Sequence, residues 1–157
     1  MKKFSITDLL IFIVATELVG VFSALISGNF RNFYSEITQP PLSPPTLVFP
    51  IVWAVLYAVM GMSAYMISVS RSPIRKDALI VWAVQLAVNF SWSIIFFRFR
   101  LLTLAAIVSV ILVLIVGIMA YMFAKIKKSA GIINIPYLLW SIFASYLAIS
   151  IAVLNNP

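Results

Sequence analysis

The sequence contains no cysteine and no histidine, and only four of its 157 residues are acidic. Without cysteine the chain forms no disulfide and offers no thiolate nucleophile. Without histidine it lacks the commonest general base, and without both it lacks the usual ligands of zinc and of haem iron. We therefore expect no metal site and no resident cofactor. The only carboxyl groups available for enzyme chemistry belong to Asp8, Glu17, Glu36 and Asp77.

Charged residues are scarce, at 10% of the chain, whereas soluble domains carry about 25%. Hydrophobic residues make up 64% of the sequence. The length allows a single domain, residues 1–157, and the composition predicts an integral membrane protein whose first partner is the lipid bilayer. A net charge of +7 can indicate a nucleic-acid partner, but here the basic residues flank the apolar runs. Membrane topology explains that placement, so we expect no nucleic-acid partner.

Five apolar runs are each long enough to cross a bilayer as a helix, which takes about 20 residues. We place these helices at about 6–27, 47–69, 78–97, 102–124 and 132–154. The predicted fold class is an all-α membrane protein, a five-transmembrane-helix bundle. Most basic residues lie before the first helix and in the second and fourth loops, so the positive-inside rule predicts a cytoplasmic N-terminus and an outer C-terminus. We expect the location to be a bacterial cell membrane.

The loop at 28–46, between the first two predicted helices, is rich in proline. Five of the eight prolines fall between positions 40 and 50. Each proline ring fixes φ and removes a backbone donor, so this run cannot continue a helix. A loop of this length in so small a protein is more often functional than idle. We predict a structured lid that leads into Trp53 and Tyr57. The alternative is an ordinary cap at the membrane interface.

The predicted third helix carries two stripes at steps of three and four residues. One stripe is aromatic and polar: Trp82, Gln85, Asn89, Trp92 and Phe96. Amide side chains inside a membrane need partners, so Gln85 and Asn89 should face other helices or a ligand. The other stripe is small: Ala83, Ala87 and Ser91. It favours close packing, either against a second copy in a homodimer or against a neighbouring helix of the same bundle.

Glu17 lies near the middle of the first predicted helix. A carboxyl group at that depth is costly and usually faces the bundle interior. No predicted helix core contains a lysine or arginine that would pair with it. Two interpretations remain open: a proton or ligand site, or a neutral carboxylic acid that joins two helices.

Four stretches together indicate a family. They are Gln39-Pro40-Pro41 with Pro44-Pro45, Pro50 through Trp53 to Tyr57 and Met60-Gly61, Gln85 to Asn89 with Trp92 and Phe96-Phe97, and Pro136-Tyr137 through Trp140 to Ala144. In order and spacing the chain resembles the TspO/translocator-protein family, also called tryptophan-rich sensory proteins or peripheral-type benzodiazepine receptors. The resemblance implies a five-helix bundle, often a homodimer. It also implies a pocket under the first loop that binds porphyrins and synthetic isoquinoline or benzodiazepine-type ligands.

By motif position, the resemblance implies that Trp53, Asn89 and Trp140 are the main pocket contacts and that Tyr34, Pro44 and Ala144 add further lining. Gln85 and Trp92 join them from the stripe described above. Arg31, Arg98 and Arg100 lie on the predicted outer side, where the positive-inside rule expects few basic residues. They can meet porphyrin propionates at the pocket mouth. Their alternative role is to snorkel to lipid headgroups. One departure from the family is that no basic residue follows Tyr146, so the sterol-associated pattern of animal members is absent.

The predicted function is a membrane receptor or sensor for a tetrapyrrole or another hydrophobic small molecule. A flat tetrapyrrole suits aromatic surfaces with a few polar contacts, and without histidine or cysteine a metal-free porphyrin fits better than a conventionally ligated haem. One alternative is a light-dependent enzyme that degrades protoporphyrin, in which Trp53 and Trp140 would be catalytic. Another alternative is a small transporter, which the absence of an internal repeat disfavours.

Overall fold

The computed structural model describes residues 5–28 and 30–155, except for the side chains of Phe30 and Arg31. The long helices are α1 (Ile6–Ser27), α3 (Val48–Ser68), α4 (Arg75–Ser93), which continues as the π-helical turn η1 (Ile94–Arg98), α5 (Leu102–Ile126) and α7 (Ile135–Asn155). Two helices are short: α2 (Phe30–Glu36) and α6 (Lys128–Ile132). Five spans are long and apolar enough to cross a membrane, which confirms the predicted fold class.

Two helices differ from the predicted ranges. The third starts at Arg75 instead of 78, and its last turn is a π-helix. The fifth is broken into α6 and α7 around Ile133 and Asn134. Pro136 explains the break, because proline has no backbone N–H with which to continue α6 but fits well in the first turn of a new helix.

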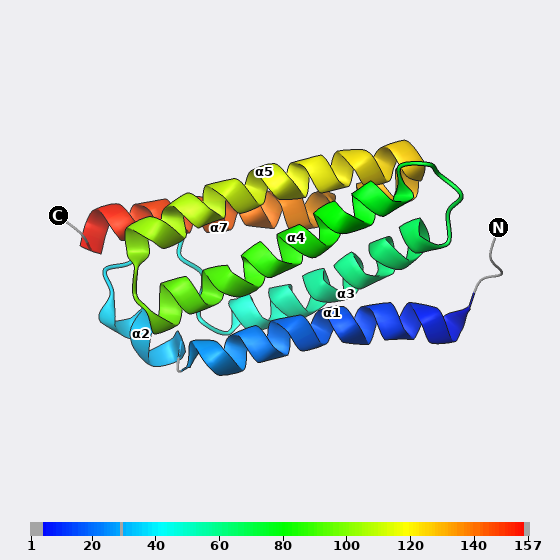
Figure 1. The fold of residues 1–157 in the computed structure, drawn as a ribbon. Helices are drawn as coiled ribbons and strands as arrows, with labels where there is room; N and C mark the ends of the chain where they lie inside the picture. Colours follow the sequence, from blue (N-terminus) through cyan, green and yellow to red (C-terminus); the bar gives the residue numbers. More distant parts are fainter. Residues whose placement is uncertain (1–4, 29, 156–157) are drawn as a thin grey trace.

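The long helices run side by side, and α1 begins at the end of the bundle opposite to the end where α7 stops (Figure 1). Helix α1 packs against α3 and α4, while α5 packs against α4 and α7. Gly61 lets α1 and α3 approach closely, because an added Cβ there would lie 2.7 Å from both the Cα of Ile13 and the carbonyl oxygen of Phe12. A small residue at such a contact brings two membrane helices into backbone contact.

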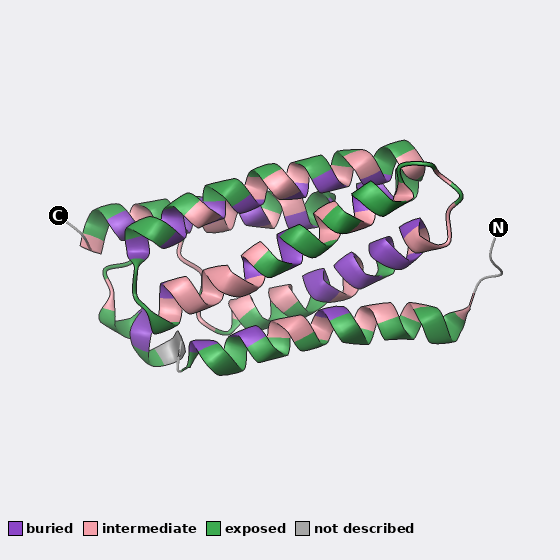
Figure 2. Cartoon of the chain, viewed as in Figure 1, coloured by how far each residue is buried: buried purple, intermediate pink, exposed green. Residues whose placement is uncertain are grey.

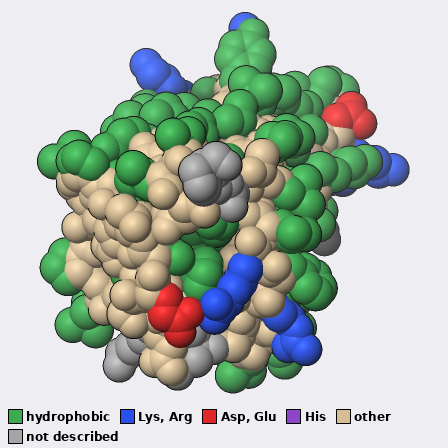
Figure 3. All heavy atoms as spheres, turned by 90° about the vertical axis from the view of Figure 1, so that its left-hand side faces the viewer, with side chains coloured by type: hydrophobic (Ala, Val, Ile, Leu, Met, Phe, Trp, Pro, Cys, Tyr) green, Lys and Arg blue, Asp and Glu red, His purple; other side chains and the backbone are tan. Residues whose placement is uncertain are grey.

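The surface of the bundle suits a lipid bilayer. Buried residues face the inside of the bundle, and the outward faces of the helices are exposed (Figure 2). Those exposed faces are rich in large apolar side chains, such as Leu25 on α1 and Val153 on α7. Figure 3 looks onto the end of the bundle that carries α2 and shows acidic and basic side chains close together there. The basic residues Lys2 and Lys3 lie outside the described part of the chain.

The proline-rich segment after α2 is tied to α7 by hydrogen bonds. The backbone N–H of Thr38 donates to Asn155 Oδ1 at 2.9 Å, and Asn155 Nδ2 donates back to the Thr38 carbonyl at 3.0 Å. The Tyr146 hydroxyl donates to the carbonyl of Pro41 at 3.0 Å. Because proline supplies no donor, these bonds come from side chains and from the backbone amide of Thr38. They fix where the segment crosses the end of the bundle.

Candidate functional site

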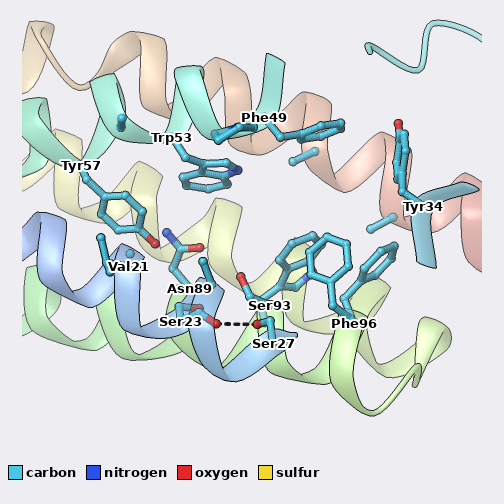
Figure 4. A pocket seen from close by; sticks show the side chains of 18 of the residues that line it. Val21, Ser23, Ser27, Tyr34, Phe49, Trp53, Tyr57, Asn89, Ser93 and Phe96 are labelled. Carbon is cyan, nitrogen blue, oxygen red and sulfur yellow. Dashed lines mark hydrogen bonds between the residues drawn. The ribbon is translucent and has the colours of Figure 1, made fainter. Parts of the chain in front are cut away.

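A cavity of about 270 Å³ lies inside the bundle. Its walls come from four long helices, and Tyr34 of α2 lies at one end (Figure 4). Besides Tyr34, the lining residues come from the four long helices: from α1, Glu17, Gly20, Val21, Ser23, Ala24 and Ser27; from α3, Phe49, Pro50, Trp53, Ala54 and Tyr57; from α4 and η1, Asn89, Trp92, Ser93, Phe96 and Phe97; and from α7, Ala144, Leu147, Ala148 and Ile151. The lining is largely apolar and aromatic, with a few polar groups, which is the usual character of a small-molecule site.

The π-helical turn shapes the aromatic wall of the cavity. It gathers Trp92, Phe96 and Phe97, with the Trp92 and Phe96 rings stacked at 5.1 Å and the Phe96 and Phe97 rings edge to face at 4.8 Å. Trp92 is held from behind, because its indole N–H donates to the carbonyl of Ala105 at 3.0 Å. A π-helical turn is rare and often marks a functional site, and here it lets two successive phenylalanines line one cavity.

The two predicted amides have different surroundings. Asn89 lines the cavity, and its Nδ2 lies 3.5 Å from the Tyr137 hydroxyl. Gln85 is fully buried and does not line the cavity. Its Oε1 accepts a 2.7 Å hydrogen bond from Tyr137, and its Nε2 points at the sulfur of Met60. Gln85 therefore links three helices, as the structural interpretation expected, and Asn89 is the amide that a ligand can reach.

The two key tryptophans are also separated. Trp53 lines the cavity and points into it beside Tyr57 and Asn89 (Figure 4). Trp140 is not among the described residues that line it. The Trp140 ring packs edge to face against Phe49, with the two centroids 6.0 Å apart, and its buried indole N–H has no hydrogen-bond partner in the described part of the chain. A direct photochemical role, which remains a prediction, fits Trp53 better than Trp140.

Of the remaining predicted lining residues, some line the cavity and one does not. Ala144 and Tyr34 line the cavity, whereas Pro44 borders a separate shallow depression on the proline-rich segment. The Tyr34 hydroxyl donates to the Pro44 carbonyl at 3.4 Å. Burial raises the pKa of the Tyr34 phenol above its ordinary value, so the phenol stays protonated at neutral pH and keeps this donor. Pro44 thus acts on the cavity through the position of Tyr34.

The arginines predicted to meet propionates lie at the α2 end. Arg98 donates to the carbonyl of Ile26 at 3.0 Å, next to the end of α1. Arg100 pairs with Glu36 at 3.1 Å and lies over the Phe33 ring, with its guanidinium carbon 4.9 Å from the centroid. Both members of that ion pair are more than half exposed, so the pair adds little stability and can exchange partners. The side chain of Arg31 lies outside the described residues.

The sequence analysis considered Glu17 of α1 but did not predict the contribution of two serines of that helix to the wall. Ser23 and Ser27 line the cavity, and Ser23 also donates to the carbonyl of Phe90 on α4 at 3.1 Å. A signal was present, because two serines one turn apart in an apolar helix mark a face that can hydrogen-bond to a neighbouring helix. The same face continues back through Gly20 to Glu17, both of which line the cavity.

The fold and the cavity define a class: an integral membrane protein of five spans that encloses an aromatic-lined cavity between its helices. Residues 12–154 match the sequence model of the TspO/MBR family, and the chain belongs to that family. It is 31% identical to Protein CrtK of Rhodobacter capsulatus, over 96% of this chain and 94% of that protein. It is 33% identical to the Tryptophan-rich protein TspO of Chlorobaculum tepidum, over 78% and 79%. The Translocator protein of Ovis aries is 28% identical, over 78% and 74%.

Proposed function

We propose that this protein is a membrane receptor or sensor that binds porphyrins of the protoporphyrin type, and synthetic isoquinoline or benzodiazepine-type ligands, in the cavity between α1, α3, α4 and α7. The observation that carries the proposal is the cavity itself, whose walls combine the faces of Trp53, Trp92 and Phe96 with the amide of Asn89. Aromatic faces hold a flat ring by stacking, and one amide supplies both a donor and an acceptor.

The size of the cavity constrains how a tetrapyrrole would bind. Its volume of about 270 Å³ is close to the lower end of the range for ligand pockets, roughly 300–1,000 Å³. A tetrapyrrole would therefore insert edge first and leave its propionates at the α2 end, where Arg98 and Arg100 lie. Charge-assisted hydrogen bonds between guanidinium and carboxylate groups would favour this orientation.

Filling the cavity tests the proposal. Ala144→Leu adds volume to the α7 wall and should weaken protoporphyrin binding by roughly five- to a hundredfold, the equivalent of about 1–3 kcal/mol of overpacking. The measurement is an absorbance titration in the dark with protein in lipid nanodiscs. Ala15→Leu is the matched control, because Ala15 is an exposed residue of α1 that does not line the cavity. Equal affinities for wild type and both variants would place the porphyrin somewhere else.

A second proposal concerns assembly. Ala83 and Ala87 are exposed on α4 and Ser91 is half-buried, so the two alanines do not pack inside the bundle as one interpretation of the stripe required. We propose that this stripe packs against a second copy in a homodimer.

Ala87→Leu should then shift the protein from dimer towards monomer while leaving each bundle folded, because the added side chain keeps the two backbones apart. Counting photobleaching steps of singly labelled chains in bilayers measures the dimer fraction, with Ala15→Leu as the control for an exposed position. An unchanged dimer fraction in Ala87→Leu argues against this interface.

A further proposal, on the orientation of the protein in the membrane, follows from the positions of its basic residues. Basic residues gather around the turns that join α3 to α4 and α5 to α6, including Arg71, Lys76 and Lys128. We propose that this end lies in the cytoplasm, as the positive-inside rule requires, and that the cavity mouth under α2 faces the opposite side of the membrane.

A further inference from the structure

The cavity wall contains one ionisable carboxyl group, that of Glu17, among the described residues that line it. Glu17 occupies the middle of α1, and its carboxyl group lies against the backbone of Ala58 on α3. That contact fixes the group at the wall but supplies no countercharge. A carboxyl group inside a membrane protein usually has a functional partner, because leaving it unpaired in an apolar environment is costly.

The described residues around the cavity do not supply that partner. Among the described residues no lysine or arginine lines the cavity, and the ion pair that they form joins Arg100 to Glu36 outside it. The other polar residues of the described lining, such as Tyr57 and Asn89, carry no charge. Within the described part of the chain Glu17 therefore has no cationic partner, and a cationic group of a ligand in the cavity would supply one.

A basic and an acidic side chain, Arg98 of η1 and Glu17, also lie at different positions along α1. Arg98 donates to the carbonyl of Ile26, which fixes it beside the last turn of α1. Glu17 lies nine residues earlier in the same helix, which corresponds to roughly 14 Å along the axis at a rise of 1.5 Å per residue. Arg98 thus lies beside the last turn of α1, whereas the carboxyl group of Glu17 belongs to the cavity wall, so a ligand whose inserted end is cationic would meet the complementary charge at Glu17.

We propose that Glu17 is a specificity-determining residue that makes the cavity prefer hydrophobic ligands with a protonated amine on the inserted end. The inference rests on the proposed function only in requiring that the cavity binds ligands. In an apolar site an ammonium–carboxylate pair is a strong charge-assisted contact, whereas an uncharged end leaves the carboxyl group unpaired and an anionic end is repelled.

Three probes with the same naphthylpropyl body test this: the ammonium, the alcohol and the carboxylate. Equilibrium binding is measured at neutral pH in nanodiscs of phosphatidylcholine, and binding to empty nanodiscs is subtracted. Wild type should bind the ammonium about ten- to a hundredfold more tightly than the alcohol, the range expected of a hydrogen bond to a charged group, and should bind the carboxylate least. Glu17→Gln should remove the preference, and Glu17→Asp should retain part of it.

Asp8→Asn is the matched control, because Asp8 is a carboxylate in the first turn of the same helix that does not line the cavity. It should keep the full preference for the ammonium. Protoporphyrin binding to Glu17→Gln shows whether that variant keeps an intact cavity.

Two results overturn the inference alone: wild type binding the alcohol as tightly as the ammonium, or Glu17→Gln binding protoporphyrin and still preferring the ammonium. If wild type binds neither protoporphyrin nor any probe, the proposed function fails and the inference fails with it.

Discussion

Replacing Gly61 with alanine will lower the stability of the bundle by about 1–3 kcal/mol, the usual cost of forcing an extra carbon into a closely packed interface. The new Cβ would lie 2.7 Å from both the Cα of Ile13 and the carbonyl oxygen of Phe12, and 2.9 Å from the hydroxyl of Thr16. The first two atoms belong to the backbone of α1, so no change of rotamer relieves the contact. Helix α1 has to move away from α3.

The matched control is Gly117→Ala in α5. A Cβ at that position meets only Leu138 Cδ1, at 4.0 Å, which is ordinary van der Waals contact. Alanine is also the better helix former, so this variant should be neutral or slightly more stable. Thermal unfolding followed by circular dichroism in the same detergent compares the two variants with wild type. If Gly61→Ala melts at the temperature of Gly117→Ala, α1 and α3 are not in backbone contact.

This change also reaches the site, because α1 carries Glu17, Ser23 and Ser27 on the cavity wall. A displaced α1 widens the cavity on that side. We therefore expect ligand affinity to fall together with stability in Gly61→Ala and to stay unchanged in Gly117→Ala.

The fold class was predictable because a bilayer leaves the backbone little choice. Every N–H and C=O inside the hydrocarbon region needs a partner within the protein, so an apolar run of about 20 residues forms a helix. The π-helical turn at Ile94–Arg98 was not predictable from the same rule. It packs Phe96 and Phe97 against each other and against Phe33 of α2, and these contacts exist only in the folded bundle.

For the candidate site, the sequence predicted which helix faces point inward but not how far along the bundle the cavity extends. A step of three and four residues placed Gln85 and Asn89 on one side of α4, and both are buried there. Tyr137, which is fully buried, donates to Gln85, and of the two amides only Asn89, one turn further along α4, lines the cavity. Trp140 is a similar case, since it packs against Phe49 of α3, which lines the cavity, and is not itself among the described lining residues. Periodicity cannot tell which neighbouring side chain fills a given depth.

Replacing Asn89 with leucine will weaken ligands that present a carbonyl group by roughly five- to a hundredfold, because losing a hydrogen bond and stranding its partner costs about 1–3 kcal/mol. Asn89 is 2% exposed yet lines the cavity, and its Nδ2 makes only a long contact of 3.5 Å with Tyr137. The amide thus keeps hydrogen-bonding capacity for a ligand. Protoporphyrin, for which we propose binding chiefly by stacking, should lose less affinity than an isoquinoline carboxamide.

Gln85→Leu is the contrasting variant. It removes the acceptor of the 2.7 Å hydrogen bond from Tyr137 and leaves a buried hydroxyl to find another partner. The Nδ2 of Asn89 lies within reach of that hydroxyl, so the amide can accept from it once it turns its Oδ1 towards Tyr137. Polar contacts inside membranes average under about 1 kcal/mol when removed, so the loss of stability should be modest. Affinity should change little, because Gln85 does not line the cavity. Titrating both variants with both ligands in the dark, and melting each without ligand, separates the two roles. If the carboxamide binds Asn89→Leu as tightly as it binds wild type, its carbonyl does not depend on Asn89. The next donor to remove would then be the indole N–H of Trp53, a residue that also lines the cavity.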